Sequence, residues 1–193
     1  EILEAGALDD ISKEEIELLT FTPDDYLLVS RLIDGTEVKI HKRFVLPHLQ
    51  RKIHELEDRG AEITVIMCTG IFPAFESKGL VITPQEILKG VLESTLKKGK
   101  LTIVFPAEEQ MHRAEPVYGR EGITIFADHL SPYESDLDVI ELSNRIRKTD
   151  PDLIFLNCFG YSQKVKTIIS QRTGKPIIHS NAVVAGVIKE LAN

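Results

Sequence analysis

The sequence is poor in cysteine, and it has no tryptophan and no long apolar run. Its 193 residues include only two cysteines, Cys68 and Cys158, far too few for a secreted protein held together by disulfides. No apolar run approaches the ~20 residues of a membrane-spanning helix. The opening residues, EILEAGALDD, also lack the basic and apolar regions of a signal peptide. These absences predict a cytoplasmic protein.

Basic residues are few relative to acidic ones. Lys and Arg together number 23 and Asp and Glu number 30, so the net charge is −7 with His neutral. A chain this acidic matches the charge of a phosphate backbone or an anionic bilayer poorly. We therefore expect no nucleic-acid partner and no membrane partner, and we leave open whether identical chains form a homo-oligomer.

The hydrophobic pattern predicts an α/β fold with mainly parallel sheets. A capping box at Ser12 and Glu15 starts a short helix, residues 26–42 form a hairpin with a two-residue turn at Asp34-Gly35, and residues 44–58 form an amphipathic helix. Strands and helices then alternate. The expected strands are 63–68, 101–105, 123–127, 153–158 and 176–179, and the expected helices are 83–96, 107–114, 135–148, 162–172 and 182–192.

The two cysteines stand in matching places. Each ends a buried strand and is followed two residues later by glycine, in MCTG at Cys68 and in NCFG at Cys158. Ligands of open parallel sheets bind beyond the carboxyl ends of the strands, and the positive end of a following helix can lower the pKa of a thiol there. We expect this effect to be stronger at Cys158, whose helix starts within about four residues. Packing is the alternative role for each cysteine.

Other patterns point away from metal and nucleotide chemistry. Glu109-x-x-His112 has the spacing of carboxylate-bridged metal sites but lacks a second copy, and no zinc-protease, serine-hydrolase, Walker or dinucleotide motif is present. We therefore predict no metal site. His179, at the end of a strand, is expected to be a packed, hydrogen-bonded histidine. The loop 71–79, with its two phenylalanines, is expected to be either a lid over the cleft or a segment packed against a neighbouring lobe or subunit.

The cysteine turns, 90 residues apart, resemble those of the aspartate/glutamate racemase superfamily, and the whole chain resembles the AroM family within it. The resemblance is carried by EAGALDD, IMCTGIFP, LVITPQEIL, IVFPAEEQ, LNCFGYSQ and PIIHSNAVVAGVIKEL. It implies two Rossmann-like lobes related by a pseudo-twofold axis. The first lobe is expected to take residues 1–99 plus 181–193, and the second residues 100–180. It also implies a further strand and helix ahead of residue 1.

The resemblance also implies a mechanism. Cys68 and Cys158 would face each other across a cleft and exchange the roles of thiolate base and thiol acid at the carbon beside a carboxylate, with no cofactor. The groups expected to hold this small carboxylate are Thr69, Gly70, Asn157, Gly160, Tyr161, Ser162, Ser180 and Asn181. Phe159 stands where amino-acid racemases carry a hydroxyl. The expected functions are therefore a racemase or isomerase, a lyase or decarboxylase of another small acid, or a protein that only binds one.

Overall fold

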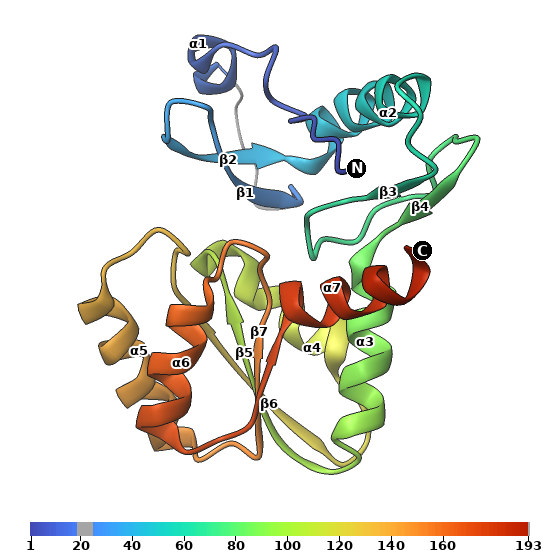
Figure 1. Ribbon diagram of the computed structural model, residues 1–193. Helices are drawn as coiled ribbons and strands as arrows, with labels where there is room; N and C mark the ends of the chain where they lie inside the picture. The colour runs from blue at the N-terminus through green and yellow to red at the C-terminus, as the bar shows by residue number, and fades with distance from the viewer. Residues whose placement is uncertain (19–24, 193) are drawn as a thin grey trace. The chain divides into compact units, whose positions relative to one another are not determined.

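The computed structural model describes residues 1–18 and 25–192 (Figure 1). Its contacts divide the chain into two compact units. The first consists of Glu1–Ile66 with Gly70–Ile82, and the second of Met67–Thr69 with Thr83–Asn193. The segment around Cys68 therefore belongs, by its contacts, to the same unit as Cys158.

The first unit contains two small sheets and one long helix. Its elements are α1 (Lys13–Glu17), β1 (Leu27–Arg31), β2 (Glu37–His41), α2 (Lys42–Asp58), β3 (Ile63–Val65) and β4 (Leu80–Ile82). Strands β1 and β2 pair antiparallel, and β3 and β4 pair parallel. The capping box is confirmed, because the Glu15 amide donates to the Ser12 hydroxyl and the Ser12 amide donates to the Glu15 carboxylate.

The hairpin is confirmed, but its turn is longer than predicted. Leu32 N–H donates to the Thr36 carbonyl at 2.9 Å, so three residues, 33–35, form the loop instead of two. Gly35 has φ 89°, and Asp34 stays outside the left-handed region. A three-residue loop that ends in a left-handed glycine matches the right-handed twist of the strands, and glycine adopts this backbone without the steric cost of a Cβ.

The loop 71–79 is packed against its own unit. Ile71 N–H donates to the Tyr26 hydroxyl at 3.0 Å. The Gln50 amide group, on α2, binds both backbone groups of Glu76, at 2.7 Å to its carbonyl and 2.9 Å from its N–H. These contacts lie within the first unit, so the lid and the packing against another lobe or subunit both stay predictions.

The second unit is built on one parallel sheet. Its elements are α3 (Pro84–Thr95), β5 (Gly99–Phe105), the 3₁₀ helix η1 (Glu108–Arg113), α4 (Ala114–Tyr118), β6 (Ile123–His129), α5 (Asp136–Thr149), β7 (Leu153–Leu156), α6 (Gln163–Thr173), β8 (Ile177–His179) and α7 (Ser180–Leu191). The strand order is β6-β5-β7-β8, and every neighbouring pair is parallel. The predicted alternation of strands and helices is therefore confirmed here.

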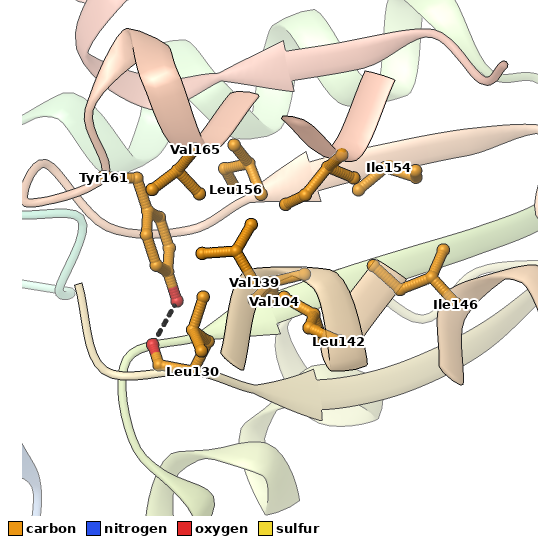
Figure 2. Close-up of a cluster of buried hydrophobic side chains, with 10 residues drawn as sticks. Val104, Leu130, Val139, Leu142, Ile146, Ile154, Leu156, Tyr161 and Val165 are labelled. Atoms are coloured by element: carbon orange, nitrogen blue, oxygen red, sulfur yellow. Dashed lines mark hydrogen bonds between the residues drawn. The ribbon is translucent and has the colours of Figure 1, made fainter. Parts of the chain in front are cut away.

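Apolar burial explains why the central strands form. Every residue of β7 is buried, as are the last five of β5, which matches strands covered on both faces. Figure 1 shows α5 and α6 on one side of this sheet and α3 on the other. The core between the sheet and α5 and α6 is a cluster of ten buried residues, drawn in Figure 2: Val104, Leu130, Val139, Leu142, Ile146, Ile154, Leu156, Tyr161, Val165 and Ile169.

The two compact units differ from the expected lobes in where two helices belong. The sequence assigns α3 and α7 to the first lobe, and these helices do contact each other. By their contacts, however, both group with the parallel sheet of the second unit. Residue 193, the end of the expected first lobe, lies outside the described residues. The lobe boundaries and the pseudo-twofold relation stay predictions.

Candidate active site

The order of the parallel sheet marks one position for a site. From β5 the chain first moves outward to β6 and then returns to the other side of β5 to form β7 and β8. Connections that leave two neighbouring strands in opposite directions open a crevice at their carboxyl ends, and ligands of such sheets bind there. Strand β7 ends at Leu156, so Asn157 and Cys158 directly follow the carboxyl end of a strand at this switch in strand order.

The sulfur of Cys158 accepts a hydrogen bond from a backbone amide. The side chain is partly exposed, and Gly160 N–H donates to Sγ at 3.3 Å. A donor aimed at the sulfur stabilises the thiolate over the thiol. Residue 160 has to be glycine, because a Cβ here would lie 2.8 Å from the ring of Pro132, closer than packed carbon atoms approach.

Asn157 joins the two cysteine turns. Its backbone N–H donates to the Val104 carbonyl of β5 at 3.0 Å, and its carbonyl accepts the Thr69 hydroxyl at 3.1 Å. Thr69 directly follows Cys68 in the chain. Residues that neighbour the two cysteines are therefore hydrogen-bonded to each other, although 88 positions separate them. The first cysteine turn lies beside the second at the carboxyl edge of the sheet.

The strand before Cys68 is shorter than the sequence predicts. Strand β3 ends at Val65, and Ile66 makes one further bond, from its N–H to the Ile82 carbonyl at 3.0 Å. Cys68 and Thr69 are partly exposed, whereas Gly70 is buried and groups by its contacts with the first unit. The turn thus leaves strand geometry two residues before Cys68.

Two hydroxyls expected to hold a substrate are engaged inside the protein. Tyr161 is fully buried, and its single hydroxyl hydrogen is shared between the carbonyls of Leu130 (Figure 2) and Phe105, each 2.8 Å from the hydroxyl oxygen. Ser180 is also fully buried, and its hydroxyl donates to the Leu156 carbonyl at 2.6 Å. Both side chains hold the carboxyl edge of the sheet together, so neither hydroxyl is directed at a ligand.

Two more of the expected residues hold the loop after Cys158. Ser162 caps α6, with its hydroxyl accepting the Val165 amide at 3.3 Å. Asn181 donates through Nδ2 to the carbonyls of Tyr161, at 3.1 Å, and Phe159, at 3.4 Å. His179 donates through Nε2 to the same Tyr161 carbonyl at 2.7 Å, and burial lowers its pKa. The expectation of a packed, hydrogen-bonded histidine is confirmed.

The sequence did not single out Tyr118 or Asp128 as part of this edge. Tyr118, at the end of α4, is buried and donates to Asn157 Oδ1 at 3.4 Å. Asp128, near the end of β6, pairs with Arg145 of α5 at 2.8 Å and raises the pKa of that guanidinium. These partners lie 39 and 17 positions apart, and no local motif links residues at such spacing. Only the folded sheet brings them together.

Comparison with known proteins places this arrangement in a family. The family model described as AroM protein matches residues 1–192. The chain belongs to the AroM family. A comparison of this AroM-family chain with curated proteins finds no match.

Solved structures are similar to this AroM-family chain at low identity. Unliganded arylmalonate decarboxylase is 15% identical, with 81% of each chain covered and a TM-score of 0.59. A second arylmalonate decarboxylase structure is 14% identical, with 81% of each chain covered and a TM-score of 0.60. The aspartate racemase of Picrophilus torridus is 18% identical over 76% of this chain and 69% of its own, with a TM-score of 0.48. The parallel strand pairs and the two arylmalonate decarboxylase structures confirm the predicted α/β fold with mainly parallel sheets.

Two further observations concern the described residues alone. Within residues 1–18 and 25–192, no helix combines the length and the apolar character needed to cross a membrane. In the same part of the chain, no three side chains of His, Cys, Asp or Glu gather closely enough to bind a metal ion. Glu109 and His112 lie on the 3₁₀ helix η1 rather than on an α-helix.

Proposed function

We propose that this protein is a cofactor-independent enzyme that transfers a proton at the carbon beside the carboxylate of a small acid. The observation that carries the proposal is the hydrogen bond from Thr69 to the Asn157 carbonyl, because it brings the two cysteine turns to one edge of the sheet. The second support is the Gly160 N–H on the Cys158 sulfur. The third is a fold shared with arylmalonate decarboxylase.

The proposed chemistry needs one acid and one base. In racemisation, one thiolate removes the α-proton from one face, the electron pair stays on the carbon and its carboxylate, and the other thiol returns a proton to the opposite face. In decarboxylation, the bond to the leaving carboxylate breaks, its electron pair stays on the α-carbon, and a thiol protonates that carbon. Backbone N–H groups at the carboxyl edge of the sheet stabilise the negative charge in both reactions.

The decisive experiment follows solvent deuterium. The full chain is incubated in D₂O, without added metal or cofactor, with phenylmalonate, aspartate or glutamate, and NMR follows deuterium at the α-carbon. We expect deuterium at the α-carbon of one of these acids, or of its decarboxylated product, and Cys158→Ser to slow its entry by about 10²–10⁴-fold. A racemase also needs Cys68, whereas a decarboxylase that uses one thiol as its acid tolerates Cys68→Ser. Met67→Leu, a change at a neighbouring exposed residue, serves as the matched control and keeps full activity.

The second candidate is a protein that binds a small carboxylate without converting it. Phe159 favours this candidate, because it stands where amino-acid racemases carry a hydroxyl. This candidate predicts that one of the same acids binds, measured by calorimetry, and that no deuterium enters the α-carbon. Deuterium entry that is lost in Cys158→Ser excludes this candidate, and binding without deuterium entry contradicts the enzyme.

A further inference from the structure

The loop between β7 and α6 is held from one side by the start of α7. Asn181, the second residue of α7, uses its amide group for two contacts. Nδ2 donates to the Phe159 carbonyl at 3.4 Å and to the Tyr161 carbonyl at 3.1 Å. An amide nitrogen carries two hydrogens, so one donor is available for each carbonyl. His179 adds a third bond, to the Tyr161 carbonyl at 2.7 Å. The Phe159 carbonyl therefore points toward α7.

The direction of that carbonyl fixes the direction of the next amide. The Phe159 carbonyl and the Gly160 N–H belong to one peptide group, and in a trans peptide the two point in opposite directions. None of the described peptide bonds is cis. Since the carbonyl faces Asn181, the N–H faces away from it, and on that side lies the Cys158 sulfur, 3.3 Å from the nitrogen.

We propose that Asn181 is a positioning residue for Cys158. By holding the Phe159 carbonyl it aims the Gly160 N–H at the sulfur and so favours the thiolate. The inference rests on the proposed function in taking Cys158 as the reacting group, and it moves Asn181 from the expected substrate contacts to a role that acts through a peptide group. Loss of the Asn181 amide lets this peptide rotate, and the sulfur then loses its aligned donor.

The charged groups near this loop do not produce the same effect. Burial raises the pKa of Tyr161 well above its usual range, and the charge of the neighbouring Cys158 raises it further, so the Tyr161 hydroxyl stays neutral. Burial lowers the pKa of His179, so its imidazole is also neutral near pH 7. The charge of Lys166, on α6, lowers the pKa of His179 as well, and the charge of Asp128, on β6, raises the pKa of Tyr161. Replacing the neutral Asn181 amide changes none of these charges.

The test measures how fast the Cys158 thiol reacts. In a Cys68→Ser background, the rate of Cys158 alkylation by iodoacetamide is measured from pH 5.5 to 9.5 for the parent, Asn181→Ala and Asn181→Leu. We expect the midpoint of the pH profile to rise by about 0.5–1 unit in both variants, because the donor stabilises only the charged sulfur. The rate at neutral pH then falls about 3–10-fold. Asn144→Ala, at an exposed position on α5, is the matched control and leaves the profile unchanged.

The two substitutions separate positioning from packing. Leucine keeps the bulk of asparagine without its donors, so a midpoint that moves in Asn181→Ala but not in Asn181→Leu reflects lost packing and overturns the proposal. Unchanged midpoints in both variants overturn it as well. If Asn181→Ala does not fold, Asn181→Leu alone decides the matter. Because no substrate is involved, a wild-type protein without turnover contradicts the proposed function and leaves this result standing.

Discussion

At the scale of single residues, Tyr161 shows how a polar group beside a reactive cysteine becomes structural. Its ring lies in the apolar cluster under α5 and α6, and its hydroxyl is 2.8 Å from the Leu130 carbonyl (Figure 2) and 2.8 Å from the Phe105 carbonyl. Phe105 is the last residue of β5, and Leu130 directly follows β6. One buried hydroxyl thus ties two strand ends to the loop that carries Cys158.

Replacing this hydroxyl tests its structural role. Tyr161→Phe keeps the ring but removes the hydroxyl that donates to the buried Leu130 carbonyl, whereas the Phe105 carbonyl keeps the Leu130 N–H at 2.9 Å. We therefore expect the free energy of unfolding to fall by about 1–3 kcal/mol near pH 7.5. Urea unfolding measures this change. Tyr133→Phe, at a partly exposed tyrosine, is the matched control and should change stability by less than about 0.5 kcal/mol. Equal effects of the two substitutions would contradict the role of Tyr161.

The effect of Tyr161→Phe on the free energy of unfolding depends on pH. Burial raises the folded-state pKa of Tyr161 above the unfolded value of about 10, so the hydroxyl contributes its full stability below pH 10 and loses it as the pH rises further. The gap in stability between wild type and Tyr161→Phe should therefore narrow between pH 9.5 and 11. A gap that stays constant over this range means that the phenol ionises equally well in the folded and unfolded states.

Residues whose partners are near in sequence could be predicted, and those with distant partners could not. The capping box of Ser12 and Glu15 follows from a local pattern, and the structure confirms it. Ser180, by contrast, was expected to face a ligand because it follows a strand at the carboxyl edge. Its hydroxyl instead reaches the Leu156 carbonyl, 24 positions away. Sequence spacing does not reveal toward which side of a loop a side chain points.

At the scale of elements, the length and apolar content of each strand decided whether it could be predicted from the sequence. The buried runs of β5 and β7 were expected, and the structure forms strands there. Strand β4 was missed, because its three residues carry too short a pattern. The parallel partner of β4 is β3, and the loop 71–79 connects the two.

A carboxylate of α2 holds the end of this loop. Glu57 Oε1 accepts the backbone amides of Lys78, at 2.7 Å, and Gly79, at 2.9 Å. We expect Glu57→Ala to lower the free energy of unfolding by about 0.5–1.5 kcal/mol, because two amide bonds are lost. Hydrogen exchange measured by NMR should also be faster at the amides of residues 78 and 79.

The neighbouring residue of α2 offers a matched control. Asp58 forms an ion pair with Lys78, and both side chains are largely exposed. Exposed pairs of this kind contribute little, so Asp58→Ala should leave the exchange of the two amides nearly unchanged. If both substitutions speed exchange to the same extent, the loop is held by general charge attraction rather than by the two hydrogen bonds of Glu57.

At the scale of the whole molecule, the sheet order turns two distant sequence motifs into one candidate site. The strand order β6-β5-β7-β8 places the end of β7 at the point where the connections diverge, and the Thr69–Asn157 bond adds the first cysteine turn. The paired turns could be predicted from the sequence, because each motif is local and the family resemblance relates them. The contacts that join them could not, since they depend on the complete sheet.

The central claim is that these turns form a reactive thiol site, and alkylation of the native protein tests it most directly. Cys68→Ser and Cys158→Ser variants are treated with iodoacetamide across a pH series, and mass spectrometry follows each remaining cysteine. We predict that Cys158 reacts faster than Cys68 at neutral pH, with a midpoint below the ~8.5 of an ordinary cysteine. Free reaction of Cys68 with an unmodified Cys158 would contradict this order. If neither cysteine reacts until the protein unfolds, both are packing residues and the proposed function is contradicted.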